Sequence, residues 1–492
     1  MRITPTMSTT SEQGTLESVG LPPADLESWR ERSSEFVITG RSAESLAADA
    51  ARLADFCRST DGLLTRLPQK PRRDPRETAA AEILKDGARH ARTVFLRAYA
   101  EPIYRAITRD YADFVRAEEL VYAAADRFPG LVPAPDLIAR ERGVLQKDKE
   151  GFEIDQGIFF SQILSHRAAG LHLVHAMLRP TARAEELLPS FRARARIDLG
   201  PVEVTRVGNA GHVTLRNTKY LNAEDDSTVL PMEIAVDLVL LDPAIEIGVL
   251  RGGVVDHPKY AGRRVFNAGI NLTHLYHGRI SFVGFYLARD LGFVNKFYRG
   301  LAGPEFLPDE PESTLEKPWI SAVEAFAIGG GCQILLTMDR VIAERSAFFS
   351  LPARKEGIIP GAANLRLTRG IGDRLARDSI FYERTFSAGS PEGAWLCNEV
   401  VETGEMDRAI ERTVTRLTSA GVVSAAANRK ALRVDQEPID QFRRYMALYA
   451  REQAYCHFSP ALIRNLEEHW DAAHRPMKEQ RDEGEDGRSS QR

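Results

Sequence analysis

AFAIGGGCQIL, residues 325–335, is the stretch that decides the fold expected of this chain, because three consecutive glycines separate two apolar runs. The pattern predicts a strand that gives way to a buried helix. Glycine has no Cβ, so the backbone there can approach a ligand closely, and the first N–H groups of the helix lack partners within it. Such a place suits an oxygen that becomes negative during a reaction. The stretch VFNAGINL, residues 265–272, could supply a second N–H donor.

The composition is that of an ordinary soluble globular protein. The chain has 492 residues, too many for a typical single domain, with 43% hydrophobic and 27% charged residues. A net charge of −4 gives no general attraction to nucleic acid or to an anionic membrane. The start lacks a signal-peptide pattern, and no apolar run approaches the ~20 residues that span a bilayer. We therefore expect a cytoplasmic protein.

The spacing of cysteine and histidine predicts no metal site. The four cysteines are scattered without a CxxC pair, which argues against a zinc knuckle or a disulfide framework. His166, His172 and His175 share a helical segment, but they lack an HExxH arrangement. We expect these histidines to pack and to form hydrogen bonds.

The pattern changes about two-fifths of the way along the chain. Before it, helical spacing dominates, with Asp74-Pro75-Arg76-Glu77 as a helix start and 152–178 as one long buried helix. After it, apolar strands alternate with helices, which implies parallel strands with helices on both faces. The predicted organisation is a poorly ordered segment at 1–39, an all-helical domain at 40–199, an α/β domain at 200–435, helices at 436–475 and a disordered tail at 476–492.

Further motifs of the second half point to a known superfamily. RVGNAGHVTLRNTKYLNA (206–223) reads as a hairpin followed by an asparagine-alanine turn, and GIIPGAANLRL (357–367) as a loop entering a helix. With the two glycine segments, they resemble the crotonase (enoyl-CoA hydratase/isomerase) superfamily. The resemblance implies an α/β spiral of ββα repeats and a CoA thioester whose carbonyl oxygen lies between two backbone N–H groups. By position, these donors are Ile270 and Gly330.

Two departures from the hydratase pattern change the expected reaction. Gln333 and Ala353 stand where enoyl-CoA hydratases carry the two glutamates that activate water. An amide takes up no proton at neutral pH, so hydration is not expected. With Gln333, Ala353 and a long helical first half, the sequence resembles a branch of the superfamily that uses O2 without metal or organic cofactor. That branch converts 3,5-dihydroxyphenylacetyl-CoA to 3,5-dihydroxyphenylglyoxylate and CoA for glycopeptide antibiotics.

Other readings remain open. A crotonase-type thioesterase or isomerase would use Glu224 to activate water or to move a proton. A degenerate, inactive crotonase is also possible. Some hydratase relatives bind RNA, but the near-neutral charge balance of this chain shows no basic helix face.

The resemblance also implies roles for individual residues. A resorcinol-like ring would be held by Glu224, His257 and Arg289, and Gln333, also a candidate catalytic residue, could bond a ring hydroxyl or the thioester region. Glu224 is the leading titratable candidate for the base that takes the α-proton, and O2-derived or substrate groups are the alternatives. The substrate loop would be Ala268, Gly269, Ile270, Asn271, Leu272 and Thr273. An apolar O2 pocket would include Ile334 and Ala353. CoA would contact Lys219, Asn222, Ala223, Lys259, Tyr260 and Asn267. The superfamily further implies a homotrimer or homohexamer whose C-terminal helices pack on a neighbouring subunit.

Overall fold

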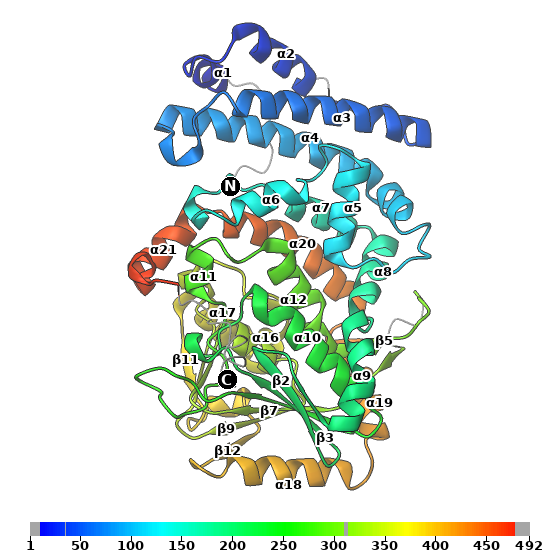
Figure 1. The fold of residues 1–492 in the computed structure, drawn as a ribbon, viewed down its shortest axis with the longest axis vertical. Coiled ribbons are helices and arrows are strands. Elements are labelled where there is room, and N and C mark those ends of the chain that lie inside the picture. The colour runs from blue at the N-terminus through cyan, green and yellow to red at the C-terminus, as the bar shows by residue number, and fades with distance from the viewer. Residues whose placement is uncertain (1–9, 35, 309–312, 478–492) are drawn as a thin grey trace, which may run out of the picture.

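The computed structural model describes residues 10–34, 36–308 and 313–477. A layer of helices from the first half of the chain lies at one end of the molecule, and the strands of the second half lie at the other (Figure 1). The α/β fold with an all-helical first half is therefore confirmed. Most of the predicted disordered tail, from residue 478 on, lies outside the described residues.

The helical half starts earlier than predicted. Its helices are α1 (Thr10–Glu17), α2 (Pro23–Ser34), α3 (Ala43–Leu64), α4 (Pro75–Ile107), α5 (Ala117–Arg127), α6 (Pro135–Glu141), α7 (Glu153–Ser165), α8 (Arg167–Leu178) and α9 (Ala182–Arg194), with short 3₁₀ turns η1 (Lys70–Arg72) and η2 (Gln146–Asp148). The expectation of poor order over 1–39 is wrong for 10–34. Trp29 is buried there, and its indole N–H donates to Thr60 Oγ1 at 2.8 Å. The predicted helix start at Asp74 is confirmed as a capping box.

The segment expected to be one helix over 152–178 is two helices, because the chain turns at His166. His166 is extended, with ψ 122°. The last carbonyls of α7 are satisfied from outside the helix, since the Arg443 guanidinium donates to the carbonyls of Leu164 and Ser165. This contact ties the C-terminal part of the chain to the helical layer.

A seven-stranded sheet forms the centre of the second half, in the order β1-β2-β3-β4-β7-β9-β12. The strands β1 to β3 pair antiparallel, and each pair from β3–β4 to β9–β12 is parallel. A smaller sheet has the order β11-β10-β8, and β5 pairs with β6. The strands are β1 (Arg196–Asp198), β2 (Val202–Val207), β3 (Ala210–Leu215), β4 (Ile247–Gly252), β5 (Leu301–Ala302), β6 (Thr314–Leu315), β7 (Trp319–Val323), β8 (Phe326–Ile328), β9 (Arg340–Glu344), β10 (Phe348–Ser350), β11 (Thr385–Ser387) and β12 (Glu399–Val401).

Residues 320–327, predicted as one strand, divide between the two sheets. Ala325 breaks the strand with φ +62°, a left-handed conformation that non-glycine residues rarely adopt. The chain thereby leaves the large sheet at β7 and enters the small sheet at β8. This turn carries the glycine run that follows β8 away from the central sheet.

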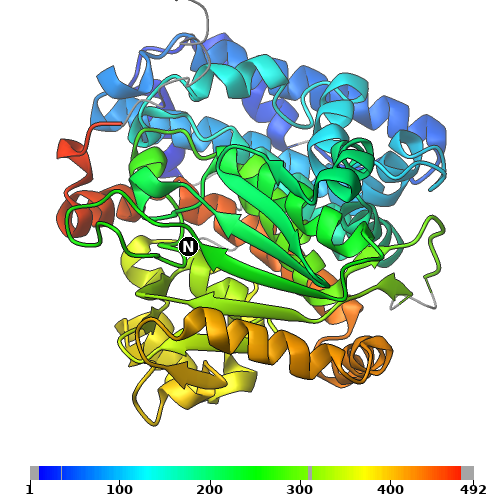
Figure 2. The same ribbon diagram turned by 60° about the horizontal axis from the view of Figure 1, so that its bottom comes forward.

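The second half also contains helices and short helical turns. They are η3 (Thr218–Tyr220), α10 (Asp226–Leu241), α11 (Leu272–Tyr276), the π-helix η4 (Phe282–Leu287), α12 (Ala288–Leu291), α13 (Phe293–Arg299), α14 (Gly330–Leu335), α15 (Ala353–Glu356), α16 (Ala363–Ile371), α17 (Asp373–Tyr382), η5 (Gly393–Trp395), α18 (Met406–Thr418), α19 (Val423–Gln436), α20 (Ile439–His457), α21 (Pro460–Trp470) and η6 (Ala472–His474). Figure 2 shows α18, in orange, across the sheet face opposite the helical layer. Met406 and Ile410 of α18 pack there in a cluster with Ile320 and Ile342.

The helix α20 joins the two halves of the molecule. It packs against α7 so closely that a Cβ on Gly157 would lie 2.4 Å from the Ala454 Cβ. The Gln146 amide donates to the His457 carbonyl at 2.8 Å. The helix α20 thus packs on helices of its own chain.

Candidate active site

The glycine run lies where β8 passes into α14. Gly329 has φ +51°, and its N–H donates to the Ser350 carbonyl at 2.8 Å. The next residue, Gly330, begins α14, and its N–H donates to no group within the described part of the chain. The junction therefore presents one backbone donor to whatever occupies the space in front of it.

A second backbone donor lies in the segment 267–270, beside β8. Ile328 N–H donates to the Asn267 carbonyl at 3.0 Å. The Ile270 N–H has no acceptor among residues 10–34, 36–308 and 313–477. A Cβ on Gly269 would lie 3.1 Å from the Gly330 nitrogen, and Ile270 and Gly330 line the same cavity. Two residues whose N–H groups have no acceptor among the described residues thus border one cavity.

A buried ion pair lies directly behind these donors. Arg289 Nε donates to Glu224 Oε2 at 2.7 Å, and Arg289 Nη2 donates to Glu224 Oε1 at 3.0 Å. The Asn267 amide donates to Glu224 Oε1 at 2.9 Å. Arg289 also donates to the Gly330 carbonyl at 2.9 Å and to Gln333 Oε1 at 2.5 Å. Because the guanidinium fixes Glu224, Gln333 and Gly330 together, it sets the geometry of this wall.

Electrostatics keep Arg289 charged. Burial by itself would lower its pKa, but the charge of Glu224 outweighs this effect, and the pKa lies above its ordinary value. Asp290 lies next to it, 3.1 Å from Nη1, and burial raises the pKa of Asp290 against the opposing effect of Arg289 and the Tyr449 hydroxyl. Gly361, in the 357–367 motif, must be a glycine, since a Cβ there would lie 2.6 Å from Asp290 Oδ2.

The cavity in front of the two donors is small and partly apolar. Its volume is about 30 Å³, more than the roughly 10–15 Å³ that a single water-sized probe needs. Its apolar side comprises Ile270, Phe285, Ile358, Ile359 and Pro360, and its polar side comprises Tyr286, Arg289, Asp290, Gln333, Glu356 and Tyr449, with Gly329 and Gly330 at the donors. The α20 residue Tyr449 lines this cavity from the C-terminal part of the chain.

Glu356 was missed in the sequence. It is 3% exposed, and burial raises the pKa of its carboxyl group to about 8. The only signal for it was a glutamate next to the apolar Gly-Ile-Ile-Pro run of the 357–367 motif. Glu356 lines the cavity, whereas Ala353, three residues earlier in α15, does not.

Comparison with known proteins identifies the family. Residues 311–458 match the enoyl-CoA hydratase/isomerase family. The chain is 48% identical over 406 residues to the (3,5-dihydroxyphenyl)acetyl-CoA 1,2-dioxygenase of Amycolatopsis orientalis, covering 82% of this chain and 92% of that protein. This chain belongs to the (3,5-dihydroxyphenyl)acetyl-CoA 1,2-dioxygenase family.

More distant similarities are to enoyl-CoA hydratases. The short-chain-enoyl-CoA hydratase of Clostridium acetobutylicum is 28% identical over 238 residues, which cover 48% of this chain and 82% of that protein. The crystal structure of an enoyl-CoA hydratase from Mycobacterium avium subsp. paratuberculosis K-10 has a TM-score of 0.45 at 19% identity, covering 55% of this chain and 98% of that one. The match of residues 311–458 and the 48% identical dioxygenase relative confirm the predicted crotonase family.

In this member of the dioxygenase family, the predicted ring-binding residues are only partly together. Glu224, Arg289 and Gln333 meet, as described above. His257 is half-buried in a loop, where its Nδ1 accepts from the Lys259 N–H at 3.2 Å. It contacts neither Glu224 nor Arg289 within the described residues.

The predicted CoA contacts divide into surface and structural residues. Lys219 and Lys259 are exposed, and Lys259 Nζ lies 5.3 Å from the Tyr260 ring centroid. Asn222 is buried, and its amide donates to the Gly253 and Val265 carbonyls at 2.9 and 2.7 Å, so this side chain holds the fold. The side chain of Asn267 is likewise committed, to Glu224 and to the Gly269 N–H at 2.6 Å.

The rest of the substrate loop is partly structural. Asn271 begins α11 by accepting from the His274 N–H and donates to Asp225 at 2.9 Å. Ala223 is buried, while Ala268, Leu272 and Thr273 are half-buried. The predicted O2-pocket residues Ile334 and Ala353 are buried but do not line the cavity; their neighbours Gln333 and Glu356 do.

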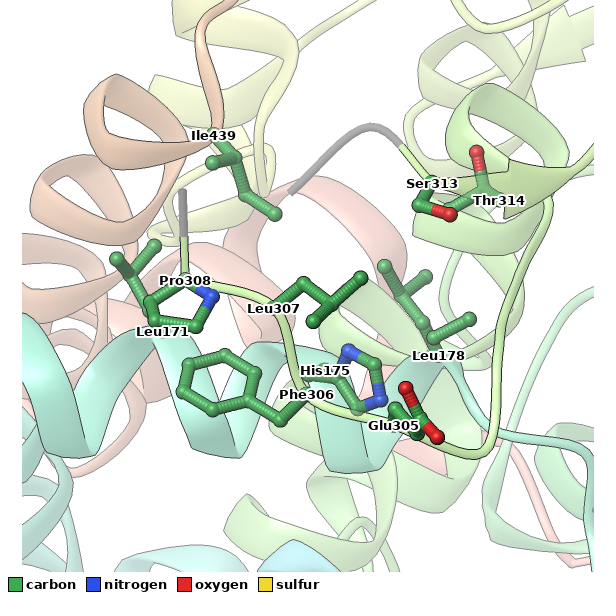
Figure 3. Close-up of a pocket in the computed structure, with 11 residues that line it drawn as sticks. Leu171, His175, Leu178, Glu305, Phe306, Leu307, Pro308, Ser313, Thr314 and Ile439 are labelled. Atoms are coloured by element: carbon green, nitrogen blue, oxygen red, sulfur yellow. The ribbon is translucent and has the colours of Figure 1, made fainter. Parts of the chain in front are cut away.

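The histidines of α8 pack as expected. His172 Nδ1 bonds to the Tyr104 hydroxyl at 2.7 Å, and His175 Nε2 to the Gly303 carbonyl at 3.1 Å. Figure 3 shows His175 beside Phe306 in a pocket. The volume of this pocket is about 20 Å³. Among the described residues, no group of three or more His, Cys, Asp or Glu is arranged to hold a metal. None of the described helices is long and apolar enough to cross a membrane.

Proposed function

We propose that this chain converts (3,5-dihydroxyphenyl)acetyl-CoA and O2 to (3,5-dihydroxyphenyl)glyoxylate and CoA, without metal or organic cofactor. One observation supports it above all. Ile270 and Gly330 line one small cavity beside the Arg289–Glu224 pair, and their N–H groups have no acceptor among the described residues, in a chain 48% identical to a dioxygenase of that name. The proposed setting is glycopeptide antibiotic biosynthesis.

The two N–H donors would stabilise the enolate oxygen of the thioester. Loss of an α-proton leaves a carbanion that both the aryl ring and the thioester delocalise. A donor aimed at such an oxygen is typically worth roughly 3–4 kcal/mol in the transition state. The electron-rich carbanion then reduces O2 by one electron, and the two radicals combine at the α-carbon.

The remaining steps balance with O2 as the only oxidant. The α-peroxide attacks the thioester carbonyl carbon and expels the CoA thiolate. Loss of the second α-proton with cleavage of the O–O bond gives the glyoxylate. Both oxygen atoms of O2 enter the keto acid, and the two α-protons are released, one of them to the CoA thiolate. The apolar side of the cavity, with Ile358 and Ile359, suits O2 and disfavours water.

The ring hydroxyls would bind at the polar wall. Glu224 accepts three N–H bonds, so one of about four acceptor positions of a carboxylate stays available to a phenol. Because Arg289 donates to Gln333 Oε1, the Gln333 amide nitrogen is the atom left to donate to a ring hydroxyl. We propose that His257 joins them when the loop around it closes over the pantetheine arm.

The wider assembly is also a proposal. CoA would run past Lys219, Lys259 and Tyr260, with the backbone at Asn222, Ala223 and Asn267 beside the adenine. We propose a homotrimer or homohexamer, in which the helical domain of residues 40–199 covers the α/β domain of 200–435.

The function is tested by oxygen uptake. Incubation with (3,5-dihydroxyphenyl)acetyl-CoA after treatment with a chelator should consume one O2 per CoA released, and ¹⁸O2 should place two labelled atoms in the keto acid. CoA release without O2 uptake would instead support the thioesterase reading. Activity abolished by the chelator would reject cofactor independence.

Changing Gly269 to alanine tests the oxyanion site. Gly269 has φ +81°, and a Cβ there would lie 2.8 Å from the Ile328 carbonyl oxygen, so the loop carrying the Ile270 N–H must shift. We expect kcat to fall by about 10²–10³-fold, the usual effect of losing one such donor. Gly208→Ala is the matched control, because Gly208 has φ +59° with nothing within 4 Å of its Cβ. Equal activity losses in both variants would contradict this role.

Changing Gln333 to methionine tests ring recognition. It removes the amide that we expect to bind a ring hydroxyl while keeping the volume of the side chain. The preference in kcat/KM for (3,5-dihydroxyphenyl)acetyl-CoA over phenylacetyl-CoA should fall by about 10–100-fold, as one lost hydrogen bond of roughly 1–3 kcal/mol predicts. Gln156→Met, a buried change in α7, should leave the preference intact. An unchanged preference in Gln333→Met would rule out this contact.

A further inference from the structure

Glu356 contacts the same cavity as the two backbone donors. Both of its carboxylate oxygens face Gly329, since a Cβ there would lie 3.4 and 3.5 Å from Oε1 and Oε2. Gly329 immediately precedes Gly330, which supplies one donor, and Ile270, which supplies the other, lines the same space. The carboxylate is therefore next to the place where a thioester oxygen would be held.

The Glu356 carboxylate is uncommitted, unlike its neighbours. It makes no hydrogen bond or ion pair within the described residues, although it is 3% exposed. Glu224 accepts three N–H bonds, two of them from Arg289, and Asp290 is bonded to Arg289 and to the Tyr449 hydroxyl. A carboxylate that must give up such bonds on protonation is the weaker base, which argues against Glu224 as proton acceptor.

The backbone holds Glu356 firmly in place. It is the last residue of α15, and its N–H donates to the Pro352 carbonyl at 2.9 Å. Gly357 follows with φ +74°, pressed against α21 so that a Cβ there would lie 3.0 Å from the Leu462 Cα. A base needs such fixed placement, because proton transfer requires hydrogen-bond reach.

We propose that Glu356 is the base that removes the α-proton of the thioester substrate. This assignment rests on the proposed function and replaces Glu224 in that role. A carboxylate oxygen of Glu356 forms an O–H bond as the α-C–H bond breaks. The electron pair stays on the α-carbon and spreads to the thioester oxygen held by the Ile270 and Gly330 N–H groups. The proton on Glu356 is later passed to the departing CoA thiolate.

The surroundings favour a strong base. With no nearby cation bonded to it, burial raises the pKa of Glu356 to about 8, closer to that of a weakly acidic C–H group. The titratable or charged groups that share the cavity wall are Tyr286, Arg289, Asp290 and Tyr449. Arg289 and Asp290 are bonded as described, and the Tyr286 hydroxyl lies 3.3 Å from His457 Nδ1.

The polar and charged side chains on and around α15 bond to groups other than the Glu356 carboxylate. Arg354 and Lys355 lie on α15 itself and pair with Glu383, at 2.7 and 3.9 Å. From α21, the Asn465 amide donates to the Arg354 carbonyl. Among the described residues, no charged group of α17 or α21 contacts the Glu356 carboxylate, so its own ionisation should govern the pH dependence.

The experiment compares the wild-type chain with Glu356→Gln, which keeps the shape and removes the base. Single-turnover rates with (3,5-dihydroxyphenyl)acetyl-CoA and O2 should fall by about 10²–10⁴-fold, the usual contribution of a general base. Anaerobic exchange of the α-hydrogens into D2O should fall in parallel, while the Kd of the substrate stays within threefold. The wild-type rate should rise with pH and level off above about 8, and the variant should lose this rise.

Two controls separate catalysis from folding. Glu141→Gln removes another buried carboxyl group whose pKa burial raises, to about 7, in the helical half, and it should keep both the rate and the pH profile. Glu356→Gln itself should unfold no earlier than wild type. Burial raises the pKa of Glu356 to about 8, so the folded wild-type protein loses stability as pH rises through 8 and this carboxyl group ionises. Glu356→Gln has no such group, and the variant should therefore be the more stable of the two above that pH.

The outcomes are distinct. A Glu356→Gln enzyme that turns over within threefold of wild type, keeps the pH rise, or loses substrate binding would overturn the assignment. If wild type exchanges its α-hydrogens without consuming O2, and Glu356→Gln abolishes that exchange, the base is supported and the proposed dioxygenase reaction fails. If wild type consumes O2 and the variant does so equally, the reaction stands and the base is refuted.

Discussion

Arg289→Ala is expected to lower the free energy of unfolding by about 3–5 kcal/mol, because it leaves the buried Glu224 carboxylate without its cation. Glu224 is 2% exposed, so water cannot replace the guanidinium. Turnover should fall by at least about a hundredfold, since Arg289 also holds Gln333 and the Gly330 carbonyl. Urea unfolding curves and single-turnover rates measure the two effects.

A double variant separates charge from geometry. Arg289→Met with Glu224→Gln removes both charges at once, so it should recover most of the lost stability while remaining inactive. Arg289→Lys should recover stability only in part, because an ammonium cannot make the two parallel bonds of the guanidinium. A double variant as unstable as Arg289→Ala would show that the uncompensated charge is not the cause.

Lys296→Met should destabilise the fold by a similar amount, about 3–5 kcal/mol, without touching the cavity. Lys296 is fully buried and pairs with Glu233 at 2.8 Å and with Asp237 at 2.6 Å. Burial tends to raise the pKa of Glu233, but Lys296 and Arg116 outweigh it and the pKa is lowered. Without Lys296, two buried carboxylates share one arginine, which is itself part of the helical half.

The pH dependence of this variant has a definite sign. Losing the Lys296 cation should raise the pKa values of Glu233 and Asp237 in the folded state. A folded protein that contains carboxyl groups with raised pKa values becomes less stable as pH rises and these groups ionise. The deficit of Lys296→Met should therefore be larger at pH 8 than at pH 5.5 in urea unfolding. Arg58→Met serves as control, because Arg58 pairs with Asp55 at 2.7 Å but both side chains are mostly exposed. That change should cost about 1 kcal/mol or less.

Local sequence patterns predicted the architecture well wherever short-range chemistry decides it. The glycine run and the Asp74 helix start need particular residues at particular backbone positions, and both appear as expected. The breaks at His166 and Ala325 depend on distant partners, namely Arg443 of α20 and the second sheet. No window of sequence contains those partners, so a single helix and a single strand were predicted.

The candidate site was predictable only as far as the family motifs reach. Glu224, Arg289, His257 and Gln333 were predicted as substrate-binding residues, and the structure brings three of them together. His257 contacts neither Glu224 nor Arg289 among the described residues. Glu356 was not predicted, because its importance comes from what surrounds it: an apolar pocket and the absence of a bonded cation among the described residues. The burial of a side chain and its hydrogen-bond partners depend on residues that are distant in the sequence. A glutamate that follows two basic residues therefore has the sequence pattern of an ordinary surface residue.

The position of α20 has a consequence for when the cavity forms during protein synthesis. Tyr449, on the helix that spans Ile439–His457, forms part of the cavity wall. That helix must pack against α7 before Tyr449 can take this position. On the ribosome, where domains fold from the N-terminus onward, this wall is made last. A growing chain that lacks α20 therefore cannot form the complete cavity, because every other lining residue precedes Tyr449.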